Sequence, residues 1–154
     1  MVIRTMLRGL GIGDTVELTD PYRVLTELLS GKFDCLIIGL HMPKLYGTEL
    51  VQLVRSHEGL PGRDLPIILM SAQTDRGTVQ KAIQAGADEV LFKPISAGEL
   101  HQRLKTVIET PRRRISVGSY RGPERRRGMP NWELRPNQRA DGTVAPRSKG
   151  EATA

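Results

Sequence analysis

Apolar and polar positions follow two different periods along the first 110 residues. Five segments repeat apolar residues every three or four positions, as an amphipathic helix does. Four shorter segments between them are apolar runs or alternating runs, as in β-strands. The apolar stripes of the five expected helices span 3–10, 24–29, 50–54, 79–83 and 100–108. The four expected strands span 15–18, 33–40, 66–70 and 89–92.

This alternation of helices and strands with short connections predicts an α/β fold with a parallel sheet and right-handed crossovers. Two of the strands, 33–40 and 66–70, are apolar on both faces, which is typical of strands buried inside a parallel sheet. In such sheets the working site lies at the carboxyl ends of the strands. Those ends fall near Gly39, Ser71 and Lys93.

Charge separates the chain into two parts. The 154 residues carry a net charge of +6, yet residues 1–110 are nearly neutral, at −1, and residues 111–154 carry +7. The last 44 residues hold five of the ten prolines and only four Ile, Leu, Val or Phe. Such a composition buries too little apolar surface to offset the entropy of ordering. We therefore expect a folded domain at 1–110 and a disordered basic tail at 111–154.

Several classes of protein are excluded by composition. The longest apolar run is about five residues, whereas a membrane span needs roughly 20. The first residues lack the apolar stretch of a secretory signal, so we expect a cytoplasmic protein. A single cysteine, Cys35, excludes an intramolecular disulfide and a cysteine-based zinc site. Its place in a buried strand predicts an inert core thiol.

Three separated motifs resemble the receiver domains of bacterial response regulators. Residues 34–43 followed by Gly47 resemble the third strand of that family and its loop, and 68–72 resemble the fourth strand with its hydroxyl residue. Residues 85–88 and then 92–94 resemble the fifth strand and its lysine–proline pair. The motifs occur in the family's order, and the resemblance covers about residues 2–109. It implies a flavodoxin-like, doubly wound parallel sheet.

The resemblance also implies a chemistry, in which a histidine kinase transfers a phosphoryl group to an aspartate at the end of the third strand. Two acidic residues after the first strand bind Mg²⁺, and a hydroxyl and a lysine hold the phosphoryl oxygens. The matching hydroxyl and lysine here are Ser71 and Lys93, which we interpret as phosphate-binding remnants. The alternative is that Ser71 caps local backbone and that Lys93 is a solvated residue at a turn.

The acceptor position is where this chain departs from the family. It is Gly39, which has no side chain to phosphorylate. Asp34 is no substitute, because five residues of strand separate it from Gly39 by about 16 Å. The first strand and its acidic pair are missing, since the sequence begins in the first helix; a start other than Met1 is the alternative explanation. We expect four of the five family strands, and we expect no Mg²⁺ binding without the acidic pair.

Two functions from different classes follow from these observations. The first is a pseudo-receiver in two-component phosphorelay signalling that works without phosphorylation. It would bind a histidine kinase or another signalling protein, through the face of the last two helices and the fifth strand. The second is a nucleic-acid-associated protein that binds through its basic tail. The tail has two other interpretations, an arm that contacts the acidic surface of a protein partner and a solubilising extension, and an enzyme is not expected. The candidate tail contacts are Arg112, Arg113, Arg114, Arg125, Arg126 and Arg127.

Overall fold

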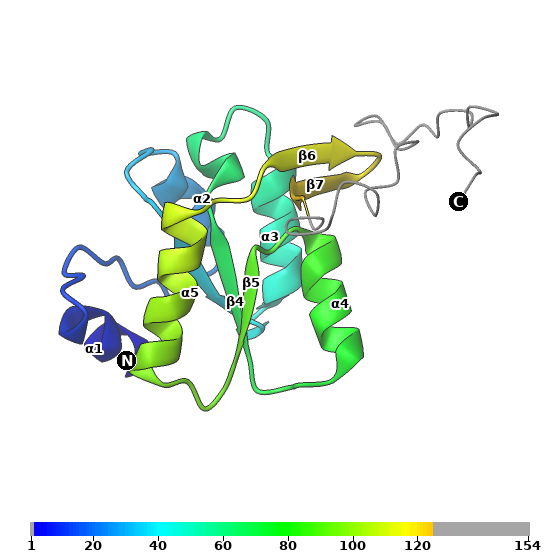
Figure 1. Ribbon diagram of the computed structural model, residues 1–154. Coiled ribbons are helices and arrows are strands. Elements are labelled where there is room, and N and C mark those ends of the chain that lie inside the picture. Colours follow the sequence, from blue (N-terminus) through cyan, green and yellow to red (C-terminus); the bar gives the residue numbers. More distant parts are fainter. Residues whose placement is uncertain (1, 125–154) are drawn as a thin grey trace, which may run out of the picture.

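A three-stranded parallel sheet forms the centre of the computed structural model, which describes residues 2–124 (Figure 1). Its strand order is β1 (Leu36–Gly39), β4 (Ile67–Ser71) and β5 (Glu89–Phe92). Leu36 lies opposite Ile67, and Ile68 lies opposite Glu89. The predicted α/β class with a parallel sheet is therefore confirmed.

The remaining elements surround this sheet. The helices are α1 (Val2–Gly9), α2 (Tyr22–Leu28), α3 (Gly47–Ser56), α4 (Arg76–Ala85), α5 (Ala97–Glu109) and the 3₁₀ helix η1 (Pro61–Asp64). The short strands are β2 (His41–Met42), β3 (Leu45–Tyr46), β6 (Arg114–Val117) and β7 (Tyr120–Pro123). None of the helices in the described part of the chain is long and apolar enough to cross a membrane.

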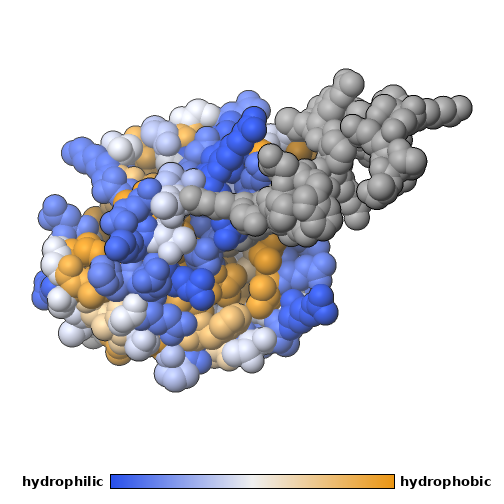
Figure 2. Space-filling view, viewed as in Figure 1, coloured by the Kyte–Doolittle hydropathy of each residue, from blue (hydrophilic) through white to orange (hydrophobic). Residues whose placement is uncertain are grey.

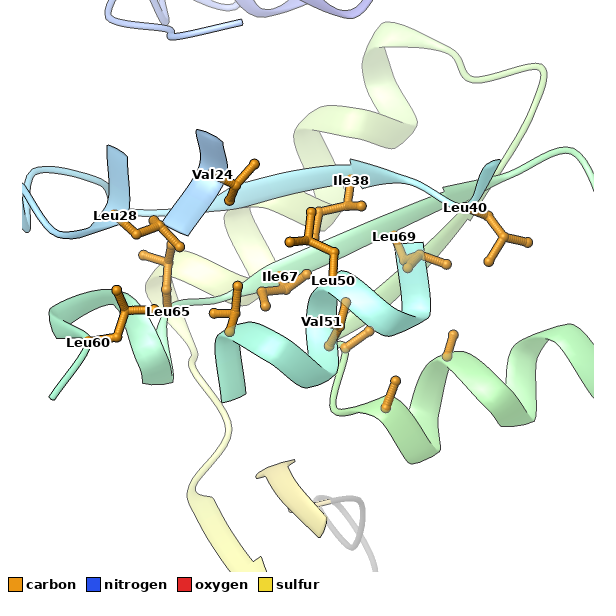
Figure 3. Close-up of a cluster of buried hydrophobic side chains, with 14 residues drawn as sticks. Val24, Leu28, Ile38, Leu40, Leu50, Val51, Leu60, Leu65, Ile67 and Leu69 are labelled. Atoms are coloured by element: carbon orange, nitrogen blue, oxygen red, sulfur yellow. The ribbon is translucent and has the colours of Figure 1, made fainter. Parts of the chain in front are cut away.

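The sheet is covered on both faces, which explains why its strands are apolar throughout. Helices α2, α3 and α4 pack on one face, against Ile67 and Leu69 of β4 (Figure 3). Helices α1 and α5 cover the other face, where Ile68 of β4 and Leu91 of β5 are buried. Successive side chains of a strand point to opposite faces, so β4 contributes to both halves of the core.

Local sequence signals set the ends of two helices. The carboxylate of Asp75 accepts the backbone N–H of Thr78 at 2.9 Å and so caps α4. Helix α4 stops at Gly86, which has a φ of +106° that other residues rarely adopt. The hydroxyl of Ser96 accepts the N–H of Glu99 at 3.1 Å and caps α5 in the same way.

The predicted strand at 15–18 does not form, so the parallel sheet has three strands instead of four. These residues run as an irregular segment in which Val16 is exposed. A strand is stabilised by pairing with a neighbour, and no strand within residues 2–124 lies on the outer edge of β1. Local β propensity alone does not hold this segment in a sheet.

The expected domain boundary at residue 110 is also corrected. Strands β6 and β7 form an antiparallel hairpin, with Arg114 opposite Pro123 and Val117 opposite Tyr120. Strand β7 contacts α3 and α4 (Figure 1). Residues 111–124 are thus part of the folded domain, because ion pairs and close backbone packing hold them where apolar residues are few. The rest of the predicted tail, 125–154, lies outside the described residues.

Candidate functional site

The three predicted site positions lie together at the carboxyl ends of the parallel strands. The N–H of Leu40, next to Gly39, donates to the carbonyl of Met70 at 2.7 Å. The N–H of Lys93 donates to the carbonyl of Ser71 at 2.8 Å. The ends of β1, β4 and β5 are therefore adjacent, and Gly39, Ser71 and Lys93 lie at the edge of the sheet where sequence reasoning expected them.

Gly39 is not a glycine that the backbone requires. A β-carbon built there would meet, apart from its chain neighbours, only the carbonyl oxygen of His41 at 3.8 Å, an ordinary contact distance. Its φ is not positive. Gly47 differs, since its β-carbon would lie 2.5 Å from the carbonyl oxygen of Gly39. Gly47 is thus needed for close packing, whereas Gly39 leaves room for a side chain.

Ser71 and Lys93 have different surroundings. Ser71 is 1% exposed, and its hydroxyl both donates to the carbonyl of Gln73 (3.1 Å) and accepts the N–H of Gln73 (2.9 Å). This is the local backbone capping of the alternative interpretation. Lys93 is exposed and precedes the cis-proline Pro94. Lys93 is therefore the group that remains accessible to an anion at this edge.

The donor set at this edge does not fit Mg²⁺. Magnesium prefers carboxylate oxygens, and Gly39 supplies none. Within residues 2–124 no group of three His, Cys, Asp or Glu side chains is placed to hold a metal ion. No step of a phosphoryl transfer can be derived from these residues.

A second polar cluster lies at the opposite, amino end of the sheet, where no site was predicted. Its centre is Arg55, which is 2% exposed. The Arg55 guanidinium donates to the carbonyls of Gly86 (3.1 Å), Arg63 (2.8 Å) and Leu65 (2.7 Å). It also donates to the carboxylate of Asp88 at 2.8 Å. These contacts join α3, the end of α4 and the starts of β4 and β5.

The carboxylate of Asp88 accepts hydrogen bonds from Arg55, Ile67 and Arg114. One oxygen accepts from Arg55 and from the N–H of Ile67, the latter at 2.9 Å. The other oxygen accepts from Arg114 of β6 at 2.7 Å. Because Asp88 is 3% exposed, the two guanidinium groups compensate a charge that would otherwise be costly to bury.

Two of the predicted tail contacts are thus engaged inside the domain. Arg114 binds Asp88, and Arg112 lies 3.4 Å from the carboxylate of Glu89. Arg113 is exposed, and no ion pair is found for it within residues 2–124. Arg125, Arg126 and Arg127 lie outside the described residues.

Burial changes the acid–base properties of two groups. Desolvation, together with the nearby Arg114 charge, lowers the pKa of Arg55 to about 10 against the opposing effect of Asp88. Arg55 is therefore still charged at neutral pH. Desolvation raises the pKa of the Cys35 thiol to about 12, so it stays protonated and is a poor nucleophile. This supports the prediction of an inert core cysteine.

The sequence contains only part of the information needed to predict the cluster around Arg55 and Asp88. Asp88 belongs to the motif 85–88 that carried the family resemblance, yet a lone aspartate before a strand does not reveal its partners. Arg55 lies on an otherwise apolar helix face beside Val51 and Val54, all of them buried. A charged residue on an apolar face indicates a buried partner, though not which one.

Comparisons with known proteins agree with this architecture. The family model of the response regulator receiver domain matches residues 1–105. The chain is 33% identical to the chemotaxis protein CheY of Pseudomonas aeruginosa over 108 residues, which are 70% of this chain and 86% of that protein. It is 31% identical to CheY-3 of Vibrio cholerae over 108 residues, covering 70% of this chain and 82% of that one.

Solved structures show the same likeness. The receiver domain of the sensor histidine kinase PA1611 from Pseudomonas aeruginosa, which has a magnesium ion in its active site cleft, superposes with a TM-score of 0.63 at 28% identity. That match covers 71% of this chain and 87% of the other. A putative response regulator from Chloroflexus aurantiacus gives a TM-score of 0.63 at 28% identity and covers 70% and 86% of the two chains.

Proposed function

Because the chain belongs to the response regulator receiver domain family, we propose that it is a pseudo-receiver that signals without being phosphorylated. It acts in a two-component pathway as a binding module, not as an enzyme, and its partner is a histidine kinase or another signalling protein. Its function is then set by which protein it binds and not by its own phosphorylation state.

Gly39 is the observation that carries this proposal. The family reaction needs a carboxylate nucleophile at the end of this strand, and glycine supplies no atom that could attack phosphorus. Space for a side chain exists, since a β-carbon there meets only a distant carbonyl oxygen. The absence of the carboxylate is therefore not a requirement of the backbone, which supports a functional origin.

The accessible cation at the same edge favours a binding role over a catalytic one. Lys93 is exposed, and we propose that it contacts an acidic group of the partner or an anion. The Ser71 hydroxyl would have to give up its hydrogen bond to Gln73 to do the same. The neighbouring face of α4, β5 and α5 is the surface that we propose for partner binding.

Phosphoryl labelling tests the proposal directly. The full chain and a Gly39→Asp variant are incubated with Mg²⁺ and ³²P-labelled acetyl phosphate, alongside an intact receiver as positive control. We expect no base-labile label on the natural chain. A stable acyl phosphate on it would refute phosphorylation independence. A parallel pull-down with histidine kinases and regulators of the host tests the binding role, which loses its basis if none is retained.

Within residues 2–124 the nucleic-acid alternative loses two of its candidate contacts, because Arg112 and Arg114 are paired with carboxylates of the domain. Nucleic-acid binding would weaken steeply as salt rises, since each neutralised phosphate releases counterions. Titration of labelled DNA and RNA at low and moderate salt decides the matter. Absence of binding at low salt removes the alternative.

A further inference from the structure

The β6–β7 hairpin lies at the amino end of the parallel sheet, away from Gly39 and Lys93 (Figure 1). Arg114 fixes β6 to Asp88, and Arg121 fixes β7 to Asp64 at 3.0 Å. Gly122 lies so close to Gly86 that a β-carbon on it would come within 2.8 Å of the Gly86 Cα. The hairpin is thus a rigidly held surface feature and not a loose extension.

Strand β6 has one edge without a partner strand. The N–H of Glu124 donates to the carbonyl of Arg113 at 2.8 Å, so these two residues form a hydrogen-bonded pair. Such pairs alternate in an antiparallel ladder, which makes Ile115 and Val117 the next residues that bond β7. The backbone groups of Arg114 and Ser116 therefore point to the outer edge. Among the described residues, no backbone bond to those groups occurs outside the hairpin.

The surroundings of this edge are basic. Residues 111–124 contain four arginines and one glutamate, a net charge of +3. Asp88 forms ion pairs with both Arg55 and Arg114, and Glu89 forms ion pairs with both Arg103 and Arg112. Hydrophilic side chains gather where β6 follows α5 (Figure 2). The positive charge beside the edge exceeds the carboxylates that are available to neutralise it.

We propose that the outer edge of β6 docks an extended acidic segment of a partner protein as a third strand. Backbone N–H and C=O groups alternate along the edge, and an extended peptide matches that alternation. A nucleic acid does not, because its phosphates would also face the carbonyl groups. A second copy is disfavoured by the +3 charge that each hairpin carries. A two-stranded hairpin is marginal by itself, so a third strand adds stability.

This docking site goes beyond the proposed function, since it lies at the opposite end of the sheet from Gly39. It assigns a partner by chemistry: an acidic strand, held through its backbone by β6 and through its carboxylates by the exposed Arg113. Ser116 is exposed, and its backbone N–H is one of the groups that point to the outer edge.

The test uses the full chain and three fluorescein-labelled peptides. They are acetyl-EVEVEV-amide, the equally charged peptide of the same sequence methylated on the backbone nitrogen of all six residues, which removes the N–H groups for a ladder, and acetyl-KVKVKV-amide. We expect fluorescence anisotropy to show binding of the EVEVEV peptide alone. In ¹⁵N-labelled protein, the amide signals of Arg114 and Ser116 should shift upon its addition.

Matched variants then separate strand pairing from charge. Ser116→Pro removes an outward N–H and keeps the bonds to β7, so the affinity for EVEVEV should fall by at least about tenfold. Ser116→Ala should bind as the natural chain does. Arg113→Glu, which does not alter the backbone, should also weaken binding, and this keeps the test valid if Ser116→Pro disturbs the hairpin.

Four outcomes would overturn the proposal. These are no binding of EVEVEV, equal binding of its N-methylated form, tighter binding of a dT12 oligonucleotide that Ser116→Pro leaves unchanged, and a dimer that Ser116→Pro dissociates. The first two remove strand addition, the third indicates a nucleic-acid surface, and the fourth assigns the edge to a second copy. None of them bears on the phosphoryl-labelling result.

Discussion

Arg55 and Asp88 are 33 positions apart in the sequence and form an ion pair of 2.8 Å that solvent hardly reaches, with side chains 2% and 4% exposed. The pair links the end of α3 to the start of β5. Arg114 completes it from the hairpin by binding the second carboxylate oxygen of Asp88. The amino end of the domain is thus organised around one buried carboxylate.

Asp88→Asn should strongly destabilise the domain. It leaves the buried Arg55 without a counter-charge, and removal of one partner of a buried pair costs about 3–5 kcal/mol. Urea unfolding followed by circular dichroism measures the change. Asp64→Asn is the matched control, because Asp64 is 48% exposed in its pair with Arg121, and should cost less than about 1 kcal/mol. Equal effects of the two variants would contradict the assignment.

The hairpin should contribute to domain stability. A chain that ends at residue 124 keeps the bond from Arg114 to Asp88, and a chain that ends at residue 110 loses it. A charge-assisted hydrogen bond contributes about 1.5–3 kcal/mol, so we expect the shorter chain to be less stable by about that amount. Thermal melts of both chains check this. Identical melting temperatures would mean that residues 111–124 are dispensable for folding.

Two neighbouring glycines, Gly39 and Gly47, should differ in how much an added side chain destabilises the domain. Gly39→Ala should change the free energy of unfolding by less than about 1 kcal/mol, because its β-carbon would meet the His41 carbonyl oxygen at 3.8 Å, an ordinary contact distance. Gly47→Ala should cost about 1–3 kcal/mol, because its β-carbon would be forced onto the Gly39 carbonyl. Denaturant titrations of the two variants, run side by side, measure the difference. A destabilised Gly39→Ala would show that glycine is structurally required there.

Stability should depend on pH through the cap of α4. Hydrogen bonds from the hydroxyl and the backbone N–H of Thr78 lower the pKa of Asp75 below its ordinary 3.8. When folding lowers the pKa of a carboxyl, the ionised group stabilises the folded state. This stabilisation is complete at pH values above the pKa of the unfolded state, and it is lost as the pH falls through the pKa of the folded state. Melting temperatures of the natural chain and Asp75→Asn should therefore differ near pH 6 and converge in strong acid. A constant difference would contradict the ionised cap.

The sequence predicted the helices and strands that depend mainly on residues close together in the chain. The apolar periods located the five α-helices of residues 2–124 and the three strands of the parallel sheet, and polar residues suited to helix caps, Asp75 and Ser96, stand at two of the helix starts. The strand at 15–18 was wrong because pairing, which is not local, decides whether a short β-prone segment joins a sheet. Gly39 and Lys93 lie at the same edge of the sheet, as expected, because the ends of parallel strands meet there.

The hairpin could not be predicted by the same reasoning. Composition indicates how much apolar surface a segment can bury, and by that measure residues 111–124 should not order. They are held instead by pairs such as Arg114 with Asp88 and Arg121 with Asp64, whose partners are 26 and 57 positions away. A run of arginines identifies these residues as basic, but it does not show which of them form ion pairs with carboxylates of the domain.

The separation of the two ends of β5 has a consequence for assembly. Lys93 follows this strand and Asp88 precedes it, so the two polar ends of the domain are separated by five positions of extended chain, or roughly 16 Å. A protein held at the Lys93 end and another held at the hairpin would therefore not compete for the same atoms. Such a chain is suited to bridge two partners in one ternary complex, in which each partner raises the local concentration of the other.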